Sequence, residues 1–293
     1  MVERERVDSA HITPSAHYTG YVWFRHRLAE PAFATVFGRW VHGFVAPINW
    51  GAQLGFGLNI EDFLLQRHLM IDARLTQAVE REGVVQVVEM ACGLSPRGRR
   101  FRQRYPQLRY LEADLPPMAA RKAALLREQG WLGPEHAVAA VDILAEDGER
   151  CLAEDGERCL AALFAGLDRE RPLVVITEGL VNYFQRPVIE AFWSRLATEL
   201  KRFPQGTYLT DLYPDLREHP RYRQIRWGVG IIGRLTRGSY PLHYRNAAEI
   251  EAAFARCGFA STLVLDPQRE GAALGLPQGR LPSLVRVIES RTA

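Results

Sequence analysis

Short apolar runs alternate with helical patterns along most of the chain, and five of the runs end in an acidic residue. The predicted strands are residues 84–88, 108–113, 137–141, 173–177 and 207–210, followed by a closing pair at 261–265 and 284–290. Such alternation predicts an α/β, Rossmann-like fold with a mostly parallel, seven-stranded sheet. The closing pair has no full helix between its strands, so it predicts an antiparallel edge.

Apolar residues at spacings of three and four predict helices between these strands. The clearest are residues 61–82, which Gly83 ends, and residues 116–129, 187–203 and 247–257. Residues 1–80 precede the first strand and are predicted to form an N-terminal helical cap, which leaves 81–293 for the sheet domain. Residues 213–245 are too long for an ordinary connection and rich in arginine, so we expect an insertion that acts as a lid.

Two segments need a separate interpretation. The most apolar window, residues 40–58, contains His42, Pro47 and four glycines, which argues against a membrane-spanning helix. We expect it to cover an apolar substrate pocket, with shallow membrane contact as an alternative. The octapeptide LAEDGERC occurs at 144–151 and again at 152–159. Two copies of so short a period predict a surface connection, not a repeat protein.

Composition indicates an ordinary globular protein. Of the 293 residues 47% are hydrophobic and 24% charged, and the net charge of +3 comes with no run of like charges that would suggest nucleic-acid binding. Cys92, Cys151, Cys159 and Cys257 lack the C-x-x-C spacing of zinc sites, so we expect free thiols and no metal. The charged N-terminus lacks the apolar run of a secretory signal, which predicts a cytoplasmic protein.

The candidate chemistry begins at the first strand. That strand passes directly into the small-residue turn Ala91-Cys92-Gly93, and the next strand ends in Asp114, 21 positions after Gly93. Doubly wound folds place a ribose-binding carboxylate at about this spacing. The turn lacks the later glycines of a dinucleotide site, and Pro96 removes an N–H donor that a phosphate would use. S-adenosylmethionine (SAM) is therefore favoured over NAD, and an NAD-dependent oxidoreductase stays an alternative.

Acidic residues end five successive predicted strands: Glu89, Asp114, Asp142, Glu178 and Asp211. Any one of them could simply cap the following helix. Because ligands of open α/β sheets bind beyond the carboxyl ends of the strands, all five together predict an acidic rim. SAM presents ribose hydroxyls, an amino group, an ammonium and a sulfonium, all of which favour acceptors or negative charge.

Several blocks, taken in order, resemble the leucine carboxyl methyltransferase family of SAM-dependent O-methyltransferases, which includes bacterial polyketide O-methyltransferases. They are residues 67–72 (RHLMID), 91–101 (ACGLSPRGRRF), 112–116 (EADLP) with Lys122, 141–142 (VD) and 178–184 (EGLVNYF). The sequence departs from the family pattern at Ala91, where the family has glycine, and at Ser95-Pro96, where it has Asp-Thr. This resemblance implies the class I methyltransferase fold and SAM as cofactor, with S-adenosylhomocysteine as product.

The resemblance also implies roles for individual residues. Arg67 would bind the methionine carboxylate, Gly93 would pass under the cofactor, Asp114 would hold the ribose, Asp142 would contact the adenine, and Glu178 would lie near the methionine end. The full set of predicted cofactor contacts is Arg67, Glu89, Gly93, Asp114, Leu115, Asp142, Ile143 and Glu178.

The acceptor side is less defined by the sequence. Tyr183, the candidate catalytic residue, and Asn182 follow the fourth strand, where methyltransferases of this architecture contact the acceptor. The other candidate substrate contacts are Tyr18, Tyr21 and Trp23 as pocket walls and Arg97 as a carboxylate anchor, and His17, His26 and His243 are candidate bases. The predicted partner is a small natural-product-like acceptor, methylated on a carboxylate or hydroxyl, with no nucleic acid and no membrane span. A protein C-terminal carboxylate is the alternative acceptor.

Overall fold

The structure is a computed structural model and describes residues 9–145, 159–215, 217, 222–223, 241–277 and 282–293. The lid expected at 213–245 and the duplicated octapeptide at 144–159 fall largely outside these residues, so both stay predictions. Of the cysteines, Cys92 and Cys257 are free thiols, as expected, whereas Cys159 is disulfide-bonded, which corrects the expectation of four free thiols.

The strands form one seven-stranded sheet in the order β3-β2-β1-β4-β5-β7-β6. They are β1 Gln86–Met90, β2 Arg109–Asp114, β3 His136–Ala140, β4 Leu173–Thr177, β5 Gly206–Leu212, β6 Ser261–Leu265 and β7 Arg286–Arg291. Strands β1 to β5 pair in parallel, and β7 pairs antiparallel with both β5 and β6. The predicted α/β fold with its antiparallel edge is therefore confirmed.

Helices occupy the predicted intervals. They are α1 Ser9–Arg25, α2 Val36–Phe56, α3 Ile60–Arg81, α4 Arg97–Arg104, α5 Pro116–Glu128, α6 Leu160–Ala165, α7 Arg186–Leu200, α9 Ala247–Arg256 and α10 Pro267–Glu270, with short 3-10 turns η1 Pro31–Phe33, η3 Val181–Tyr183 and η4 Gly271–Leu274. Helix α5 has prolines in its first turn, where a missing N–H breaks no helical hydrogen bond. Helix α2 includes Pro47 and covers most of the apolar window expected at 40–58.

The sheet buries both of its faces, as a parallel sheet requires. On one face, Val87, Val174 and Ile176 pack with α3 and α4. On the other, Val88 and Val175 pack with α6, α7 and α9. Neighbouring residues of one strand thus enter opposite cores, because side chains alternate along a strand.

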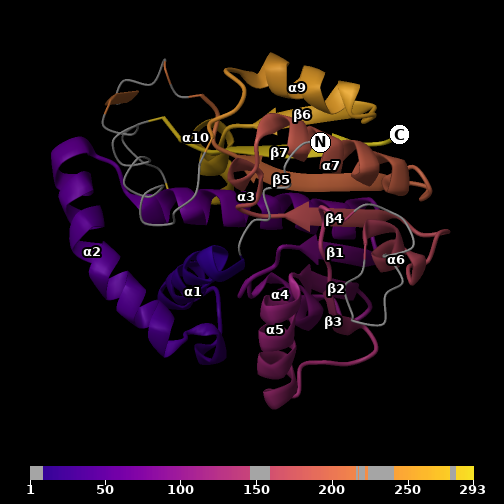
Figure 1. The fold of residues 1–293 in the computed structure, drawn as a ribbon, viewed down its shortest axis with the longest axis horizontal. Helices are drawn as coiled ribbons and strands as arrows, with labels where there is room; N and C mark the ends of the chain where they lie inside the picture. Colours follow the sequence, from indigo (N-terminus) through magenta and orange to yellow (C-terminus); the bar gives the residue numbers. More distant parts are fainter. Residues whose placement is uncertain (1–8, 146–158, 216, 218–221, 224–240, 278–281) are drawn as a thin grey trace.

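The segment before β1 forms three helices, of which α3 packs on a face of the sheet. Helix α3 contacts β5 and β7, whereas α1 and α2 lie beyond the ends of the parallel strands, with α2 as the outermost element (Figure 1). The carboxyl ends of the strands therefore face α1, not open solvent.

Among the described residues, no helix is long and apolar enough to cross a membrane.

Candidate functional site

The strand register aligns the ends of the central strands. Met90 of β1 pairs with Ala113 of β2 on one side and with Thr177 of β4 on the other, and Thr177 pairs with Thr210 of β5. The residues that follow, Asp114, Glu178 and Asp211, therefore emerge along one edge at intervals of about 4.8 Å per strand. Asp114 ends β2 and Glu178 follows β4, as predicted, whereas Asp211 lies one residue before the end of β5 and is 1% exposed.

Glu89 lies one residue inside the strand, not at its tip. The expected strand 84–88 is displaced by two residues in the structure, so that β1 ends at Met90. The Glu89 side chain is buried beneath the edge, where Oε1 accepts a hydrogen bond from Arg97 and Oε2 accepts one of 2.7 Å from the Tyr110 hydroxyl. Glu89 thus supports the rim from below.

The turn after β1 brings the predicted glycine and aspartate together. Ala91 and Gly93 both have positive φ, at 52° and 50°. The Gly93 N–H donates to Asp114 Oδ2 at 2.7 Å, and the Leu115 N–H donates to Asp114 Oδ1 at 2.8 Å. Burial raises the pKa of Asp114, although the two N–H donors oppose the shift. Each carboxylate oxygen has two lone pairs, so both oxygens keep capacity for a further donor such as a ribose hydroxyl.

Helix α1 packs directly on this turn. A Cβ added at Gly93 would lie 3.2 Å from the Cβ of Ala16, and one added at Gly20 would lie 3.1 Å from the Cβ of Leu94. The glycines therefore allow the close approach of α1 to the end of β1. Helix α1 thus forms the roof of the turn, in the sense that it covers the turn from above the strand ends, and a ligand bound at the turn would lie near α1.

Arg97 joins three carboxylates beneath the rim. Its Nε donates to Asp72 Oδ1 at 2.6 Å, its Nη1 to Glu89 Oε1 at 2.5 Å, and its Nη2 to Glu178 Oε2 at 2.6 Å. The side chain is 0% exposed. Burial alone would lower the pKa of Arg97, but Glu89, Asp72 and Glu178 hold it well above its ordinary value. A charge so fully engaged is a structural support of the rim.

Arg67 connects the ends of β4 and β5. Its Nε lies 3.1 Å from Glu178 Oε1 and its Nη1 lies 3.4 Å from Asp211 Oδ2. Burial would raise the pKa of Glu178, yet His68, Arg97 and Arg67 keep it well below its ordinary value. For Asp211, burial dominates and raises the pKa. A Cβ at Gly179 would lie 2.8 Å from Arg67 Nη2, so the glycine makes room for the guanidinium.

The remaining predicted cofactor contacts lie at the ends of β2 and β3. Asp142 is half-buried and accepts the Leu144 N–H at Oδ1, which forms a tight turn. Ile143 is buried, and Leu115 begins the turn into α5. The structure therefore brings Asp114, Leu115, Asp142 and Ile143 to the β2 and β3 side of the edge, opposite Arg67 and Glu178.

The predicted acceptor contacts divide into buried and accessible residues. Trp23 is 2% exposed and stacks on His68 with ring centroids 4.3 Å apart, so it is a core residue and not a pocket wall. Arg97 is likewise too deeply buried to anchor a substrate, which corrects that expectation. Tyr18 and Tyr21 pack around the His42 ring and keep partial exposure.

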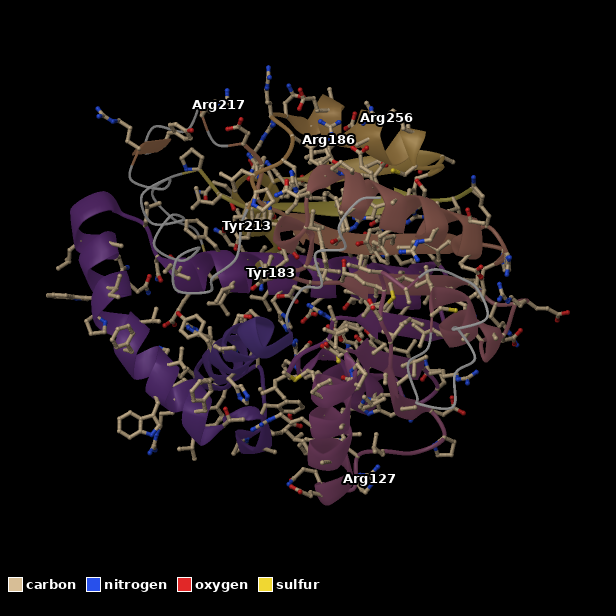
Figure 2. The ribbon with its side chains drawn as sticks, in the orientation of Figure 1. Arg127, Tyr183, Arg186, Tyr213, Arg217 and Arg256 are labelled. Carbon is tan, nitrogen blue, oxygen red and sulfur yellow. The ribbon has the colours of Figure 1, made fainter. Side chains whose placement is uncertain are left out.

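Tyr183 and Asn182 lie at the turn after β4. The Tyr183 hydroxyl donates to Ser15 Oγ at 3.3 Å, which connects this turn to α1. Asn182 is 2% exposed, and its amide binds backbone groups of Tyr213 and Pro241. Figure 2 shows Tyr183 and Tyr213 at the end of the sheet that faces α1. Asn182 therefore holds neighbouring chain segments in place.

The candidate bases are engaged with protein groups. His17 Nδ1 lies 2.8 Å from Thr35 Oγ1, and burial together with Arg121 lowers its pKa. His26 Nε2 lies 2.7 Å from Glu61 Oε2. His243 Nε2 lies 2.7 Å from the Phe184 carbonyl oxygen, and burial lowers its pKa.

Several supports of the rim lie in the blocks that carry the family resemblance but received no role from the sequence. His68 Nδ1 lies 2.8 Å from Glu178 Oε2, and Asp72 binds both Arg97 and Arg100. The available signal was polar residues among buried apolar positions of helix α3. A second buried pair, Lys122 with Glu112 at 3.2 Å, lies below the β1 turn, where Lys122 also donates to the Ser95 carbonyl oxygen at 2.5 Å.

A cavity of about 280 Å³ lies between α3, α4 and η4. Its lining includes Leu69, Asp72, Thr76 and Arg100, none of which follows the end of a strand. Because Asp72 also binds Arg97, the cavity adjoins the ion-pair cluster beneath the rim. Among the described residues, no group of three or more His, Cys, Asp and Glu side chains could hold a metal ion.

Comparison with known proteins gives a family match and a fold match. The model of the leucine carboxyl methyltransferase family matches residues 52–197. A protein from Thermobifida fusca YX, assigned as a methyltransferase, is 14% identical with a TM-score of 0.58, over 98% of this chain and 99% of that one. The CurJ carbon methyltransferase is 16% identical with a TM-score of 0.52, over 97% and 69% of the two chains. No curated protein matches the sequence. The structural likeness shows the class I methyltransferase fold.

Proposed function

Because the chain belongs to the leucine carboxyl methyltransferase family, whose model matches residues 52–197, we propose that it is a SAM-dependent O-methyltransferase of a small acceptor molecule. The observation that carries the proposal is the pairing of the Gly93 turn with Asp114, supported by Glu178 and Arg67 two strands away. The turn, the carboxylate and the arginine occupy one edge of the sheet, where open α/β folds bind ligands.

The residues along the edge fit the chemistry of SAM. Asp114 retains acceptor capacity for ribose hydroxyls, and Asp142 offers a half-buried carboxylate toward the β3 end. Arg67 supplies a cation for a ligand carboxylate, and Glu178 supplies negative charge for an ammonium or sulfonium. Bound SAM would supply an electrophilic methyl group at this edge. We assign Gly93, Leu115 and Ile143 to shape and apolar contact.

The chain's own contribution to transfer is alignment and exclusion of water. Helix α1 covers the β1 turn, and Tyr183 connects the end of β4 to that roof through Ser15. We propose Tyr183 as the residue nearest to the acceptor, with Tyr18 and Tyr21 as walls. A carboxylate acceptor is ionised at neutral pH and needs no base. A phenol acceptor, in contrast, would benefit from a general base. The candidate bases His17, His26 and His243 are all engaged with protein groups, which favours a carboxylate acceptor.

Two alternatives are less favoured. An NAD-dependent oxidoreductase would place a pyrophosphate at the β1 turn, but the Gly93 N–H of that turn already donates to Asp114 and is not available to a phosphate. A protein C-terminal carboxylate would need an open groove for a polypeptide. The close packing of α1 on Gly93 and Leu94 supports a small acceptor instead.

Calorimetric titration tests the cofactor, and product analysis tests the reaction. We expect saturable binding of S-adenosylhomocysteine and none of NAD, and saturable binding of NAD alone would end the proposal. Incubation of the protein with methyl-labelled SAM and a panel of small carboxylates and phenols should then give a labelled ester. Label on carbon, or label only on C-terminal peptides, would reject the O-methylation of a small acceptor.

A further inference from the structure

Helix α2 has its polar side against the protein and its apolar side toward solvent. Apolar residues at spacings of three and four normally face the core of a surface helix. In α2 the buried positions are instead Gly38, His42 and Asn49, and the large apolar residues point outward. Figure 1 shows α2 at the outer margin of the molecule, with α1 between it and the sheet.

Hydrogen bonds and close backbone packing hold the inner side of α2. Asn49 Nδ2 donates to Asn59 Oδ1 at 2.8 Å, and Asn49 Oδ1 accepts the Ile60 N–H at 2.7 Å. His42 Nε2 lies 2.9 Å from Glu61 Oε1. A Cβ at Gly38 would collide with the His17 backbone oxygen. The inner face is therefore built for this chain, and its contacts do not explain the apolar residues on the other side.

The outer face is a continuous apolar surface. It consists of Val36 (68% exposed), Phe37 (48%), Trp40 (73%), Phe44 (70%), Ile48 (53%), Trp50 (65%) and Leu54 (68%). At 100° per residue these side chains cover an arc of roughly 160°. Together they expose on the order of 800 Å² of side-chain surface, which is about what one partner contributes to a standard protein interface and exceeds the usual largest apolar patch of a monomer.

Three glycines lie on the same outer face. Gly43, Gly51 and Gly55 are exposed, and a Cβ added at any of them would meet none of the described residues within 4 Å. Glycine inside a helix destabilises it relative to alanine, and no contact within the described residues requires glycine at these positions. A second helix that approaches the α2 backbone closely would require it.

We propose that the outer face of α2 is the interface of a homodimer, in which α2 packs on α2 of a second copy. An isologous interface needs a self-complementary patch, and an uncharged apolar face meets that need. Arg39 is the one charged residue of α2, so the helix lacks the basic belt with which interfacial helices contact anionic lipid. This inference does not rest on the proposed function, because α2 contributes none of the residues assigned to the rim.

Sedimentation equilibrium of the full chain across the micromolar range tests the proposal. We expect a reversible dimer for the unaltered protein. The double variant Trp40→Glu/Phe44→Glu should weaken dimerisation by at least about 100-fold, because aromatic anchors at the centre of an interface carry most of its stability. Gly51→Leu should also weaken it, by about tenfold or more, while leaving the monomer folded, since an added Cβ there meets nothing within 4 Å in the described part of the chain.

Val188→Glu is the matched control, since it places the same charge on an exposed apolar position of α7, which is 38% exposed. It should leave the dimer intact. Far-UV circular dichroism and binding of S-adenosylhomocysteine should be unchanged in all variants, which separates dimer loss from unfolding. A protein that is monomeric at every concentration overturns the proposal. The apolar face of α2 would then be covered by a lipid surface, which binding to phosphatidylglycerol vesicles would detect, or by another segment of the same chain. A dimer that persists in both α2 variants overturns it equally, because the interface would lie elsewhere.

Discussion

Arg97 Nη2 lies 2.6 Å from Glu178 Oε2, so a residue at the start of α4 and a residue at the end of β4 share one buried hydrogen bond. Asp72 and Glu89 accept hydrogen bonds from the same guanidinium, and its Nη2 also lies 2.9 Å from His68 Nδ1. Four elements, α3, α4, β1 and β4, thus meet at one cation. The geometry of the rim above depends on that meeting point.

Removal of the Arg97 charge should strongly destabilise the fold. Arg97→Ala leaves three buried carboxylates without their shared partner, and loss of one member of a buried ion pair typically costs about 3–5 kcal/mol. Arg97→Lys should recover little, because one ammonium cannot reproduce the geometry of a guanidinium fork. Urea denaturation measures both. Arg104→Ala removes a surface pair with Glu80 and should cost less than about 1 kcal/mol. Equal losses for Arg97→Ala and Arg104→Ala would refute the assignment.

Acid should unfold the protein through the same cluster. The pKa of Glu178 is held well below its ordinary value of 4.5, and that of Asp72 is also lowered. A depressed pKa in the folded state gives stability that is present above the unfolded-state pKa and is lost as pH falls through the folded-state pKa. Melting temperatures should therefore fall steeply below about pH 4.5. Glu178→Gln should be less stable at pH 7, and its deficit should shrink as the pH falls.

Glu128→Gln is the control for this pH profile, because Glu128 is exposed on α5. Its melting curve should follow that of the unaltered protein at every pH. A constant difference between Glu178→Gln and the unaltered protein across the acid range would show that the Glu178 charge does not contribute to stability.

Comparison of Gly93→Ala with Gly83→Ala should separate the cost of backbone strain from the cost of disturbing the packing of α1. Gly93 and Gly83 both have positive φ, so alanine costs roughly 1–2 kcal/mol at either position. At Gly83 the new Cβ meets nothing within 4 Å among the residues that the structure describes, whereas at Gly93 it lies 3.2 Å from the Cβ of Ala16. Gly93→Ala should therefore be the more destabilising and should also weaken binding of S-adenosylhomocysteine, while Gly83→Ala leaves binding unchanged. Calorimetry measures binding and thermal unfolding measures stability. If the two variants behaved identically, the packing of α1 on Gly93 would not contribute to the site.

Asp114→Asn should weaken cofactor binding more than folding. The amide keeps one acceptor, but its NH₂ would face a backbone N–H of Gly93 or Leu115. Loss of hydrogen bonds to a charged carboxylate costs about 1.5–3 kcal/mol, or roughly 10- to 100-fold in the dissociation constant for S-adenosylhomocysteine. Asp168→Asn, outside the rim, should bind normally. Normal binding by Asp114→Asn would exclude Asp114 from the site.

The strands and the rim were predictable because both follow from local patterns. A buried parallel strand is a short apolar run, and β4 and β6 begin and end where the sequence predicts. Glu89 was misplaced because Val84 and Val85 continue the apolar run before the hydrogen-bonded ladder starts at Gln86. Strand ends depend on pairing with neighbours, which periodicity alone does not contain.

Partners across the fold were not predictable. Arg97 was assigned to the substrate because a guanidinium can orient a carboxylate with two hydrogen bonds, and only the packing of α3 against α4 brings Asp72 to it. Trp23 was assigned to a pocket wall, but His68 of α3 takes its ring face. Helix α2 was expected to cover a pocket on the basis of its apolar composition, and the sequence did not indicate which side would face out.

Asn182 should act by holding the chain after β5 in place. Its Oδ1 accepts the Tyr213 N–H at 2.8 Å, and its Nδ2 donates to the carbonyl oxygens of Tyr213 and Pro241 at 3.0 and 2.8 Å. Asn182→Ala would leave three backbone groups unsatisfied in a buried place and should cost about 2–4 kcal/mol. Asn182→Asp keeps the acceptor for the Tyr213 N–H but has no donor for the two carbonyls at neutral pH, so it should not restore the lost stability.

Hydrogen exchange distinguishes this role from a general loss of stability. In Asn182→Ala the Tyr213 amide should exchange faster by a larger factor than the amides of β4, because the change opens one connection and leaves the sheet paired. Asn246→Ala removes the cap of α9 and should cost about 1 kcal/mol without affecting Tyr213. If Tyr213 and the β4 amides accelerated equally, Asn182 would support the whole fold and not the segment beside Arg67. Since Arg67 interacts with Tyr213, loosening that segment should also weaken binding of S-adenosylhomocysteine.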